Sequence, residues 1–182
     1  MIFIQDDYFE SETFKMIQEY CEQEFRIVTA GEKDFSILDT PNELIPLLQV
    51  EGYDLILTFI RSAHKEFDTD LRIHADSIIN GHKTALAKVF YISGDEVSKN
   101  GTAFYKHNHY GKTLPKDVSD EDFDRLINED SNDHKQWVKQ DIVVGIPNRM
   151  LTYDSNYFHS KFPSKIERGV RKVLVCFYKK AE

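Results

Sequence analysis

The sequence has few cysteines and no long apolar run, and these two absences narrow the class of protein. Only two cysteines, Cys21 and Cys176, occur in 182 residues, which is too few for a disulfide framework. No apolar stretch is long enough to cross a bilayer as a helix, and the first residues lack the regions of a secretory signal. We therefore expect a soluble, cytoplasmic protein with no membrane partner and with both thiols buried.

Basic residues are also in short supply. Lysine and arginine number 23 against 31 aspartates and glutamates, so the formal net charge is -8. Nucleic-acid-binding surfaces draw much of their affinity from clustered basic residues that contact phosphates, and we therefore expect no nucleic-acid partner. The length and the 41% hydrophobic content indicate one domain, residues 1–182, with a sizeable core. Nothing in the sequence indicates an oligomeric state.

The N-terminal region, residues 1–70, is predicted to be a largely helical support for the rest of the chain. Apolar residues recur at helical spacing from Ser11 to Phe25, and Ser11 is suited to cap that helix. The segment 25–38 is interpreted as one or two strands around a turn at Gly31. Apolar residues along one side of 54–67 predict a second amphipathic helix that packs on a sheet.

The remaining part of the chain, from about residue 71, is predicted to be β structure. Its runs of β-branched and aromatic residues are bounded by Gly, Pro, Asn and Asp, as strands commonly are. These runs are 70–76, 84–92, 149–153 and 171–178, with an Asn80-Gly81 turn after the first. The last run is apolar on both faces, so we expect it to be buried on both sides. A mainly β jelly roll, the double-stranded β-helix, with flanking helices satisfies that expectation.

His74, Asp76 and His159 form the most informative set of residues. Residues two apart on a strand project from the same face, so His74 and Asp76 would lie side by side, and another strand could bring His159 to them. Two histidines and one carboxylate are the ligand set of non-haem Fe(II) oxygenases, which leaves positions on the metal open. An H-x-D pair is unremarkable by itself, and its weight comes from the strand-like segments around it.

The order of these segments resembles the 2-oxoglutarate- and Fe(II)-dependent dioxygenases, in particular the prolyl 4-hydroxylase-like group. The resemblance covers residues 71–178 and rests on the HxD strand and on VFYIS, GTAFYKH, NRMLTYDSNYFHS and GVRKVLVCFY. It implies that His74, Asp76 and His159 are the catalytic iron ligands, with Fe(II), 2-oxoglutarate and O2 as cofactor and co-substrates. It also implies a hydroxylase that forms succinate and CO2. The substrate would be a peptide or protein side chain, with prolyl as the first candidate, or a small molecule.

The resemblance also assigns residues to the 2-oxoglutarate itself. Arg171 falls where the family binds the distal carboxylate, and Tyr91 falls where some members use a tyrosine hydroxyl for it. A guanidinium group pairs with a carboxylate through two charge-assisted hydrogen bonds. Arg168 competes for this role, but Arg171 opens a strand and follows Gly169 in the family's G-x-R arrangement. Lys88 lies in an apolar strand and either reaches solvent or faces the cavity as a second anion partner.

The segment between about residues 106 and 140 departs from the family because it is longer and heavily charged. A short helix is predicted over 119–128, with Ser119 as its cap. Long loops in compact domains are often lids or binding loops, so this insertion is either a lid over the active site or an acidic surface excursion. No carboxylate is placed to join His107 and His109 as metal ligands, and we expect both to face solvent or substrate.

Two other functions compete with that of a 2-oxoglutarate-dependent dioxygenase. The first is a non-catalytic jelly-roll module that binds a protein or a sugar. The intact His-Asp-His set argues against it, because a retired site need not keep these residues together. The second is a cupin-like metalloenzyme that does not use 2-oxoglutarate. Arg171 argues against it, because that chemistry has no distal carboxylate to bind.

Overall fold

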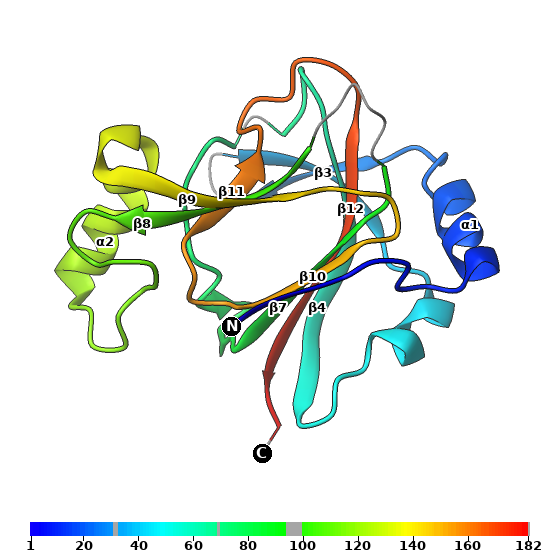
Figure 1. Cartoon of the computed structure of the whole chain (residues 1–182), viewed down its shortest axis with the longest axis horizontal. Helices are drawn as coiled ribbons and strands as arrows, with labels where there is room; N and C mark the ends of the chain where they lie inside the picture. The colour runs from blue at the N-terminus through cyan, green and yellow to red at the C-terminus, as the bar shows by residue number, and fades with distance from the viewer. Residues whose placement is uncertain (31–32, 69, 94–99, 182) are drawn as a thin grey trace.

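Two antiparallel sheets face each other in the computed structural model, which describes residues 1–30, 33–68, 70–93 and 100–181. The larger sheet has the strand order β1-β10-β7-β12-β4-β3-β2, and the smaller sheet has the order β11-β8-β9 (Figure 1). A separate hairpin is formed by β5 and β6. This two-layer arrangement of antiparallel strands confirms the predicted jelly-roll fold.

The strands are β1 (Ile2–Gln5), β2 (Arg26–Ala30), β3 (Lys33–Asp39), β4 (Tyr53–Ala63), β5 (Ile78–Ile79), β6 (His82–Lys83), β7 (Leu86–Tyr91), β8 (Gly101–His107), β9 (Trp137–Val144), β10 (Met150–Asp154), β11 (His159–Phe162) and β12 (Arg171–Lys180). The helices are α1 (Ser11–Tyr20), α2 (Asp120–Asn128) and the short 3-10 helices η1 (Asn42–Leu48), η2 (Asp130–Asn132) and η3 (His134–Gln136).

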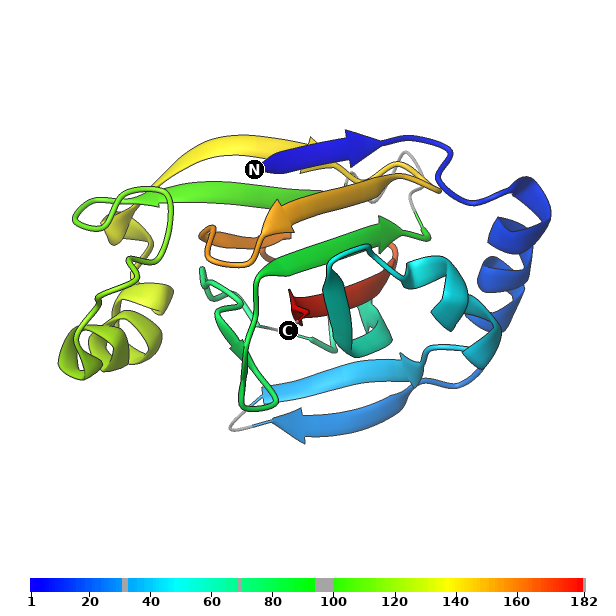
Figure 2. The same cartoon turned by 90° about the horizontal axis from the view of Figure 1, so that it is seen from below.

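The central strand β12 separates two apolar layers. Its inner side chains Val173, Val175 and Phe177 pack between the two sheets, whereas Leu174 and Cys176 pack under α1 and η1. Figure 2 shows these helices at one end and on the outer face of the larger sheet. Burial of each large aliphatic side chain contributes about 1.5–3 kcal/mol. The prediction that the last strand is buried on both faces is therefore confirmed.

The prediction of a second helix over 54–67 is wrong, because most of this segment forms the eleven-residue strand β4. β4 pairs with β3 on one edge and with β12 on the other. A strand inside a sheet that is covered on both faces carries apolar residues on both sides, and such a run also contains the helical spacing. The β-branched and aromatic content of Leu55–Ile60 was the better signal.

Smaller differences concern the ends of elements. The segment 70–76 is not a strand, because His74 alone forms an isolated bridge, with His159. Glu10 is the N-cap residue of α1 in place of Ser11, and no side chain caps that helix. The strands β2 and β3 confirm the interpretation of 25–38, although Gly31 itself lies outside the described residues.

Several local predictions are confirmed. Asn80 and Gly81 have φ values of 51° and 76°, which a tight two-residue hairpin turn requires. The Ser119 hydroxyl accepts a hydrogen bond of 3.1 Å from the backbone N–H of Asp122 and caps α2. Both thiols are buried. In the part of the chain that the structure describes, no helix has the length and apolar character needed to span a membrane.

The charged segment between β8 and β9 lies at one end of the two sheets (Figure 1). The two ends of the predicted insertion belong to the smaller sheet, because His107 in β8 pairs with Trp137 in β9. We call the residues between these strands, 108–136, the excursion. The excursion itself carries α2, η2 and η3. It is therefore anchored on both sides by the smaller sheet.

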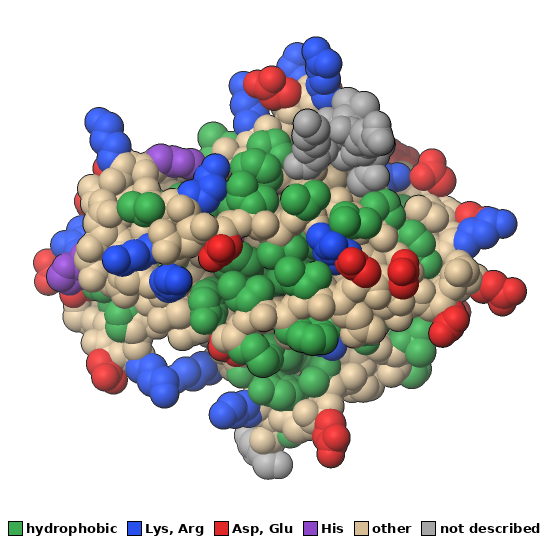
Figure 3. Space-filling model, viewed as in Figure 1, with side chains coloured by type: hydrophobic (Ala, Val, Ile, Leu, Met, Phe, Trp, Pro, Cys, Tyr) green, Lys and Arg blue, Asp and Glu red, His purple; other side chains and the backbone are tan. Residues whose placement is uncertain are grey.

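The edge strands β1 and β9 carry exposed apolar side chains on the face shown in Figure 3. On β9, Val138, Ile142 and Val144 are exposed, and the exposed Lys139 and Asp141 interrupt them. Charged residues on an edge strand oppose edge-to-edge pairing with other chains.

Candidate active site

The backbone brings the three predicted ligands together from two distant segments. His74 and His159 exchange backbone hydrogen bonds of 3.0 and 2.9 Å, and the N–H of Asp76 donates to the carbonyl of Ser155 at 2.8 Å. One ligand atom from each of His74, Asp76 and His159 lies within 4.8 Å of the other two. A single bridge between the segments is therefore enough to assemble the triad.

Both imidazole rings are oriented by backbone carbonyl groups. Nδ1 of His74 lies 3.2 Å from the carbonyl oxygen of Arg72, and Nδ1 of His159 lies 2.9 Å from that of Tyr157. A carbonyl only accepts, so each Nδ1 carries the proton and donates it. Each Nε2 is then directed at Asp76, at 3.5 Å from His74 and 3.1 Å from His159. A ring whose other nitrogen donates to a backbone carbonyl in this way is typical of histidine metal ligands.

The charges of the triad favour a cation at its centre. Burial alone would raise the pKa of the Asp76 carboxyl, but His159 and His74 outweigh it and hold this pKa well below its usual range. Burial alone would lower the pKa of His74, but the neighbouring Asp76 raises it. The carboxylate is thus ionised beside a proton-binding imidazole. A divalent cation would compete with that proton for the same Nε2.

Tyr153 is a part of this site that the sequence did not reveal. Its hydroxyl lies 3.0 Å from Nε2 of His159 and donates to Oδ2 of Asp76 at 3.4 Å. Burial, together with the negative charge of Asp76, raises the pKa of Tyr153 well above its ordinary value, so the phenol stays protonated. The only sequence signal was alternation along β10, which puts Tyr153 on the same face as the core residue Leu151.

Arg171 is a buried cation that has no counter-ion among the described residues. It opens β12 on the inner face of the larger sheet, and its residue surface is 5% exposed. Among the described residues it forms no ion pair, and its Nε has no hydrogen-bond partner. Burial lowers the pKa of Arg171 from its usual value, yet a guanidinium group keeps its charge in proteins. A buried unpaired charge is costly, and an anionic ligand would remove that cost.

The other candidates for the anion contact lie elsewhere or are already engaged. The Tyr91 ring lies 5.9 Å from Cζ of Arg171, and the Tyr91 hydroxyl hydrogen-bonds Oγ1 of Thr102 at 2.7 Å. Arg168 is exposed in the loop before β12. Lys88 turns to the helix-covered face, where its Nζ lies 5.7 Å from the Tyr8 ring. The cavity-facing alternative for Lys88 is therefore wrong, because alternation along β7 places it opposite to Tyr91.

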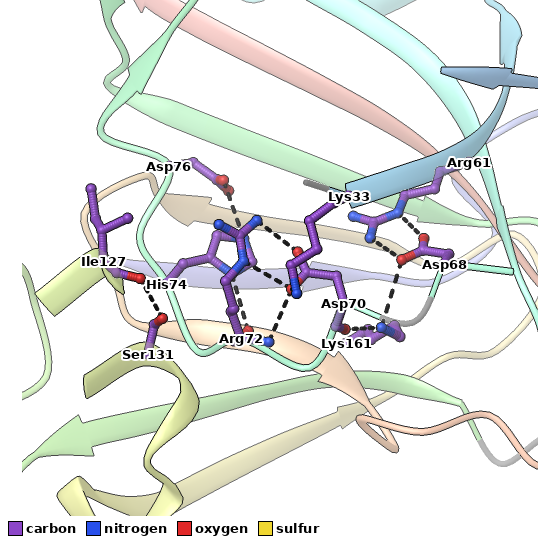
Figure 4. A network of polar contacts seen from close by, with 10 residues as sticks. All are labelled: Lys33, Arg61, Asp68, Asp70, Arg72, His74, Asp76, Ile127, Ser131 and Lys161. Carbon is purple, nitrogen blue, oxygen red and sulfur yellow. Dashed lines mark hydrogen bonds and ion pairs between the residues drawn. The ribbon is translucent and has the colours of Figure 1, made fainter. Parts of the chain in front are cut away.

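An ionic network connects the larger sheet to residues 70–76, the triad segment that carries His74 and Asp76 (Figure 4). Arg61 and Lys161 contact Asp68, and Arg72 and Lys33 contact Asp70. Burial lowers the pKa of Lys161 to about 8. Four basic groups thus share two carboxylates, and Arg61 and Asp68 are near enough to act electrostatically on Arg171. The local excess of positive charge favours an anion in a protein whose net charge is negative.

A pocket of about 210 Å³ reaches the triad from the side of α2. His74 and Asp76 lie in its wall, together with residues from 72–79 and from the excursion between β8 and β9. Arg171 is not among the described residues that line it. The wall of the pocket therefore includes two members of the triad but not the buried guanidinium group.

His107 has a structural environment that contradicts its expected exposure. Its side chain is buried, and Nε2 lies 3.2 Å from Oδ2 of Asp130 in η2. Nδ1 accepts hydrogen bonds from the backbone N–H groups of His109 and Tyr110 at 3.2 and 3.3 Å. Asp130 is the carboxylate that sequence spacing did not place beside His107, because the turn after α2 returns it to the end of β8. His109 itself is exposed.

Comparisons with known proteins identify the fold. No protein-family model and no curated protein sequence matches the chain. The structure of the α-ketoglutarate-dependent carbocyclase SnoK from nogalamycin biosynthesis matches 100% of this chain and 80% of its own, with a TM-score of 0.70 and 11% identity. HygX from Streptomyces hygroscopicus, with nickel and 2-oxoglutarate bound, matches 99% of this chain and 83% of its own, with a TM-score of 0.58 and 13% identity.

A prolyl-4-hydroxylase from Pseudomonas putida is also similar in structure. It matches 100% of this chain and 93% of its own, with a TM-score of 0.57 and 10% identity. Of these three, SnoK is described as a non-haem α-ketoglutarate-dependent enzyme, and HygX has 2-oxoglutarate bound. At these identities the likeness establishes the fold, and the argument for function depends on the residues of this chain.

Proposed function

We propose that this chain, which has the fold of the 2-oxoglutarate- and Fe(II)-dependent oxygenases, is an oxygenase of that kind. The reaction we infer is hydroxylation of a substrate C–H bond with formation of succinate and CO2. The observation that carries the proposal is the combination of a His-Asp-His triad with the buried guanidinium group of Arg171, which has no counter-ion among the described residues. A metal site alone would not need that second, costly charge.

The side chains of the triad fit the proposed metal. His74, Asp76 and His159 would hold Fe(II) through two imidazole nitrogens and one carboxylate, the set that suits non-haem iron. Bound iron would supply the oxidising chemistry, with O2 and 2-oxoglutarate as co-substrates. The protein supplies the orientation: the carbonyls of Arg72 and Tyr157 hold the two rings, and the Tyr153 hydroxyl holds Asp76.

The co-substrate is recognised on the inner face of the larger sheet. Arg171 would bind the distal carboxylate of 2-oxoglutarate through two parallel N–H···O bonds. The Tyr91 ring lies beside Arg171, and the hydrogen bond between the Tyr91 hydroxyl and Oγ1 of Thr102 holds that ring in place. The burial of Arg171 between the two sheets would exclude water from its ion pair with the carboxylate, which would be stronger than an ion pair on the surface.

An anaerobic titration of the metal-free protein with Fe(II) and 2-oxoglutarate tests this proposal. We expect the weak visible charge-transfer band of an iron-chelated keto acid in the wild type and no band in His74→Ala or Asp76→Ala. Arg171→Ala should need roughly ten- to a hundredfold more 2-oxoglutarate, as expected for loss of a charged hydrogen-bonding partner. The matched control is Arg168→Ala, which removes an exposed arginine three residues away and should leave the titration unchanged.

The same titration separates the competing functions. Iron binding without a keto-acid band, in a folded protein, would favour a cupin-like metalloenzyme that does not use 2-oxoglutarate. Absence of iron binding would favour a non-catalytic jelly-roll module. Succinate formation with a candidate prolyl peptide, measured against the same peptide without proline, then tests the first substrate candidate.

A further inference from the structure

We propose that the substrate group admitted to this site is apolar and uncharged, and that α2 selects it. The inference rests on the proposed function, because it assigns the pocket beside His74 and Asp76 to the substrate. It goes beyond that function by naming the chemical class of the substrate and the element that recognises it.

The wall of the pocket is formed mainly by apolar side chains. Apart from the two ligands and two polar residues, the lining consists of Ile73, Ala75, Ile78, Ile79, Leu114, Phe123, Leu126 and Ile127. Three of these residues, Phe123, Leu126 and Ile127, belong to α2. An acidic first turn gives α2 a charged outer surface, so the helix presents opposite chemistries to solvent and to the pocket. The apolar side is what a substrate meets.

The two polar residues in the wall, Arg72 and Ser131, are already engaged. The Arg72 guanidinium group donates to both carboxylate oxygens of Asp70, at 2.9 and 2.8 Å. The Ser131 hydroxyl donates to the carbonyl of Ile127 at 2.5 Å. Apart from Asp76, which is assigned to the metal, this wall offers a charged substrate group no ionic partner. Such a group would therefore lose its hydration without compensation, which is unfavourable. An apolar group would gain from burial.

α2 is held against the triad segment, so the pocket is largely pre-formed. The carbonyl of Ser131 accepts a hydrogen bond of 3.0 Å from the N–H of Ile73, next to His74. Figure 4 shows Ile127 and Ser131 facing this segment. The carbonyl of Asp130 accepts from Nε1 of Trp137 at 2.7 Å and joins the excursion to β9. These bonds fix the distance between the apolar side of α2 and the triad.

The volume limits the size of the apolar group. A cavity of ~150 Å³ lined by Leu, Ile and Phe is sufficient for benzene, and this pocket measures about 210 Å³. One ring or a short branched chain fills it. A ring attached to a short polar arm would place the arm at the opening of the pocket.

Three small compounds of similar size but different charge test the proposed class. They are 2-phenylethanol, 2-phenylethylamine and phenylacetate, titrated by protein-observed NMR into the metal-free double variant Asp76→Asn, Arg171→Met. The first substitution removes the carboxylate that would otherwise pair with the ammonium group in the absence of metal. Removing the Arg171 guanidinium group prevents phenylacetate from binding at the proposed 2-oxoglutarate position. We expect 2-phenylethanol to bind at least tenfold more tightly than either ion and to shift the resonances of α2. Equal or tighter binding of either ion in this pocket, or no binding by any of the three, would overturn the proposal.

A charge introduced at the rim should change the preference. Ile78 and Ile127 line the pocket and are 61% and 39% exposed, so Ile78→Glu and Ile127→Glu should preserve the fold. Each should weaken 2-phenylethanol binding and favour 2-phenylethylamine. The matched control is Ile27→Glu, at a 48% exposed position on β2, which should bind as its parent does. An unchanged preference in both pocket variants would contradict the assignment of this wall.

Failure of this inference is distinguishable from failure of the proposed function. A keto-acid charge-transfer band without selective binding of 2-phenylethanol would retain the oxygenase and reject the apolar substrate class. Selective binding without the band would reject the oxygenase and with it the assignment of the bound group as substrate.

Discussion

Two arginines on the inner face of the larger sheet differ in their ionic partners. Arg61 in β4 makes a two-pronged ion pair with the fully buried Asp68. Arg171 in β12 forms no ion pair with any described residue. The first arginine neutralises a carboxylate of the chain itself, and under the proposed function the second neutralises an anionic ligand. This difference predicts opposite effects of the same substitution.

Arg171→Met should leave the unfolding free energy of the ligand-free protein unchanged or raise it. Replacing a buried charge that has no counter-ion by an apolar group of similar size removes the cost of burying that charge. Arg61→Met should instead destabilise by up to about 3–5 kcal/mol, since it leaves a buried carboxylate without its main partner. Urea denaturation of the two variants beside the wild type measures both changes.

Addition of 2-oxoglutarate and a divalent metal under anaerobic conditions gives the matching control. With the metal present in every sample, 2-oxoglutarate should raise the midpoint of the wild type by mass action and should raise that of Arg171→Met much less. A large loss of stability in ligand-free Arg171→Met would show that the guanidinium group has a structural partner, and the argument for its ligand role would fail.

Residue types revealed the triad, but not the partners that orient it. His74, Asp76 and His159 could be selected from the sequence because their chemistry is unusual on strand-like segments, and Arg171 could be selected from the resemblance to the dioxygenases. Tyr153 and the Asp130 partner of His107 could not, because tyrosine and aspartate are ordinary residues in such segments. Their roles arise from contacts between elements that are far apart in the chain.

At the scale of elements, His107 is an attachment point for the excursion that carries α2. Burial lowers the pKa of His107, although the facing Asp130 opposes this effect, and the nearby His109 and Arg125 add to it. In this environment the ring is neutral and its Nδ1 accepts two backbone hydrogen bonds. Protonation would convert that acceptor into a donor and break both bonds.

The excursion should therefore loosen in mild acid. A folded-state pKa below the unfolded value of ~6.5 means that this contribution to stability is present above pH ~6.5 and is lost as the pH falls through the folded-state pKa. Hydrogen exchange of residues 108–136, corrected for the intrinsic effect of pH, should be faster at pH 5 than at pH 7.5. Peptides from β4 serve as the control, and equal protection of 108–136 at both pH values would contradict the prediction.

The wrong prediction of a helix over 54–67 also has a physical explanation. β4 lies between two strands and under side chains on both faces, so it needs no polar face. Without a polar face, its apolar residues are consistent with a helix as well as a strand. Pairing with β12 along its length decides the outcome, and that pairing is a tertiary contact.

At the scale of the whole molecule, the two cysteines report on the integrity of the core. Burial raises the pKa of the Cys21 thiol, and likewise that of Cys176, to about 11. Cys21 lies at the end of α1, and Cys176 lies in β12 beneath it. The thiolate is the reactive form, so both groups should be inert while the core is intact.

A chromogenic disulfide reagent should detect no thiol in the native protein at pH 8 and two thiols after denaturation. Because the folded-state pKa values exceed the unfolded values, the stability contributed by the neutral thiols is present below pH ~9 and is lost as the pH rises through about 11. The double variant Cys21→Ser, Cys176→Ala is the control for the reagent. Rapid modification of either thiol in the native state would show that the helix layer opens readily.

The sequence by itself determined the fold class, most of the strands of the central layer and the chemical identity of the triad. Alternation and composition within a segment are local properties, and the strands 84–92 and 171–178 were recognisable from them. The ligand types were recognisable because two histidines and a carboxylate in strand-like segments are a chemically restricted set.

Only the tertiary structure decided which of the basic residues faces the site, what orients the ligands and what lines the pocket. Arg171, Arg168 and Lys88 all carry a positive charge, and their roles differ because one is buried between the sheets, one is exposed and one lies under the helices. The wall formed by α2 likewise depends on where the excursion folds back. Such facts require contacts across the whole chain, which no local pattern contains.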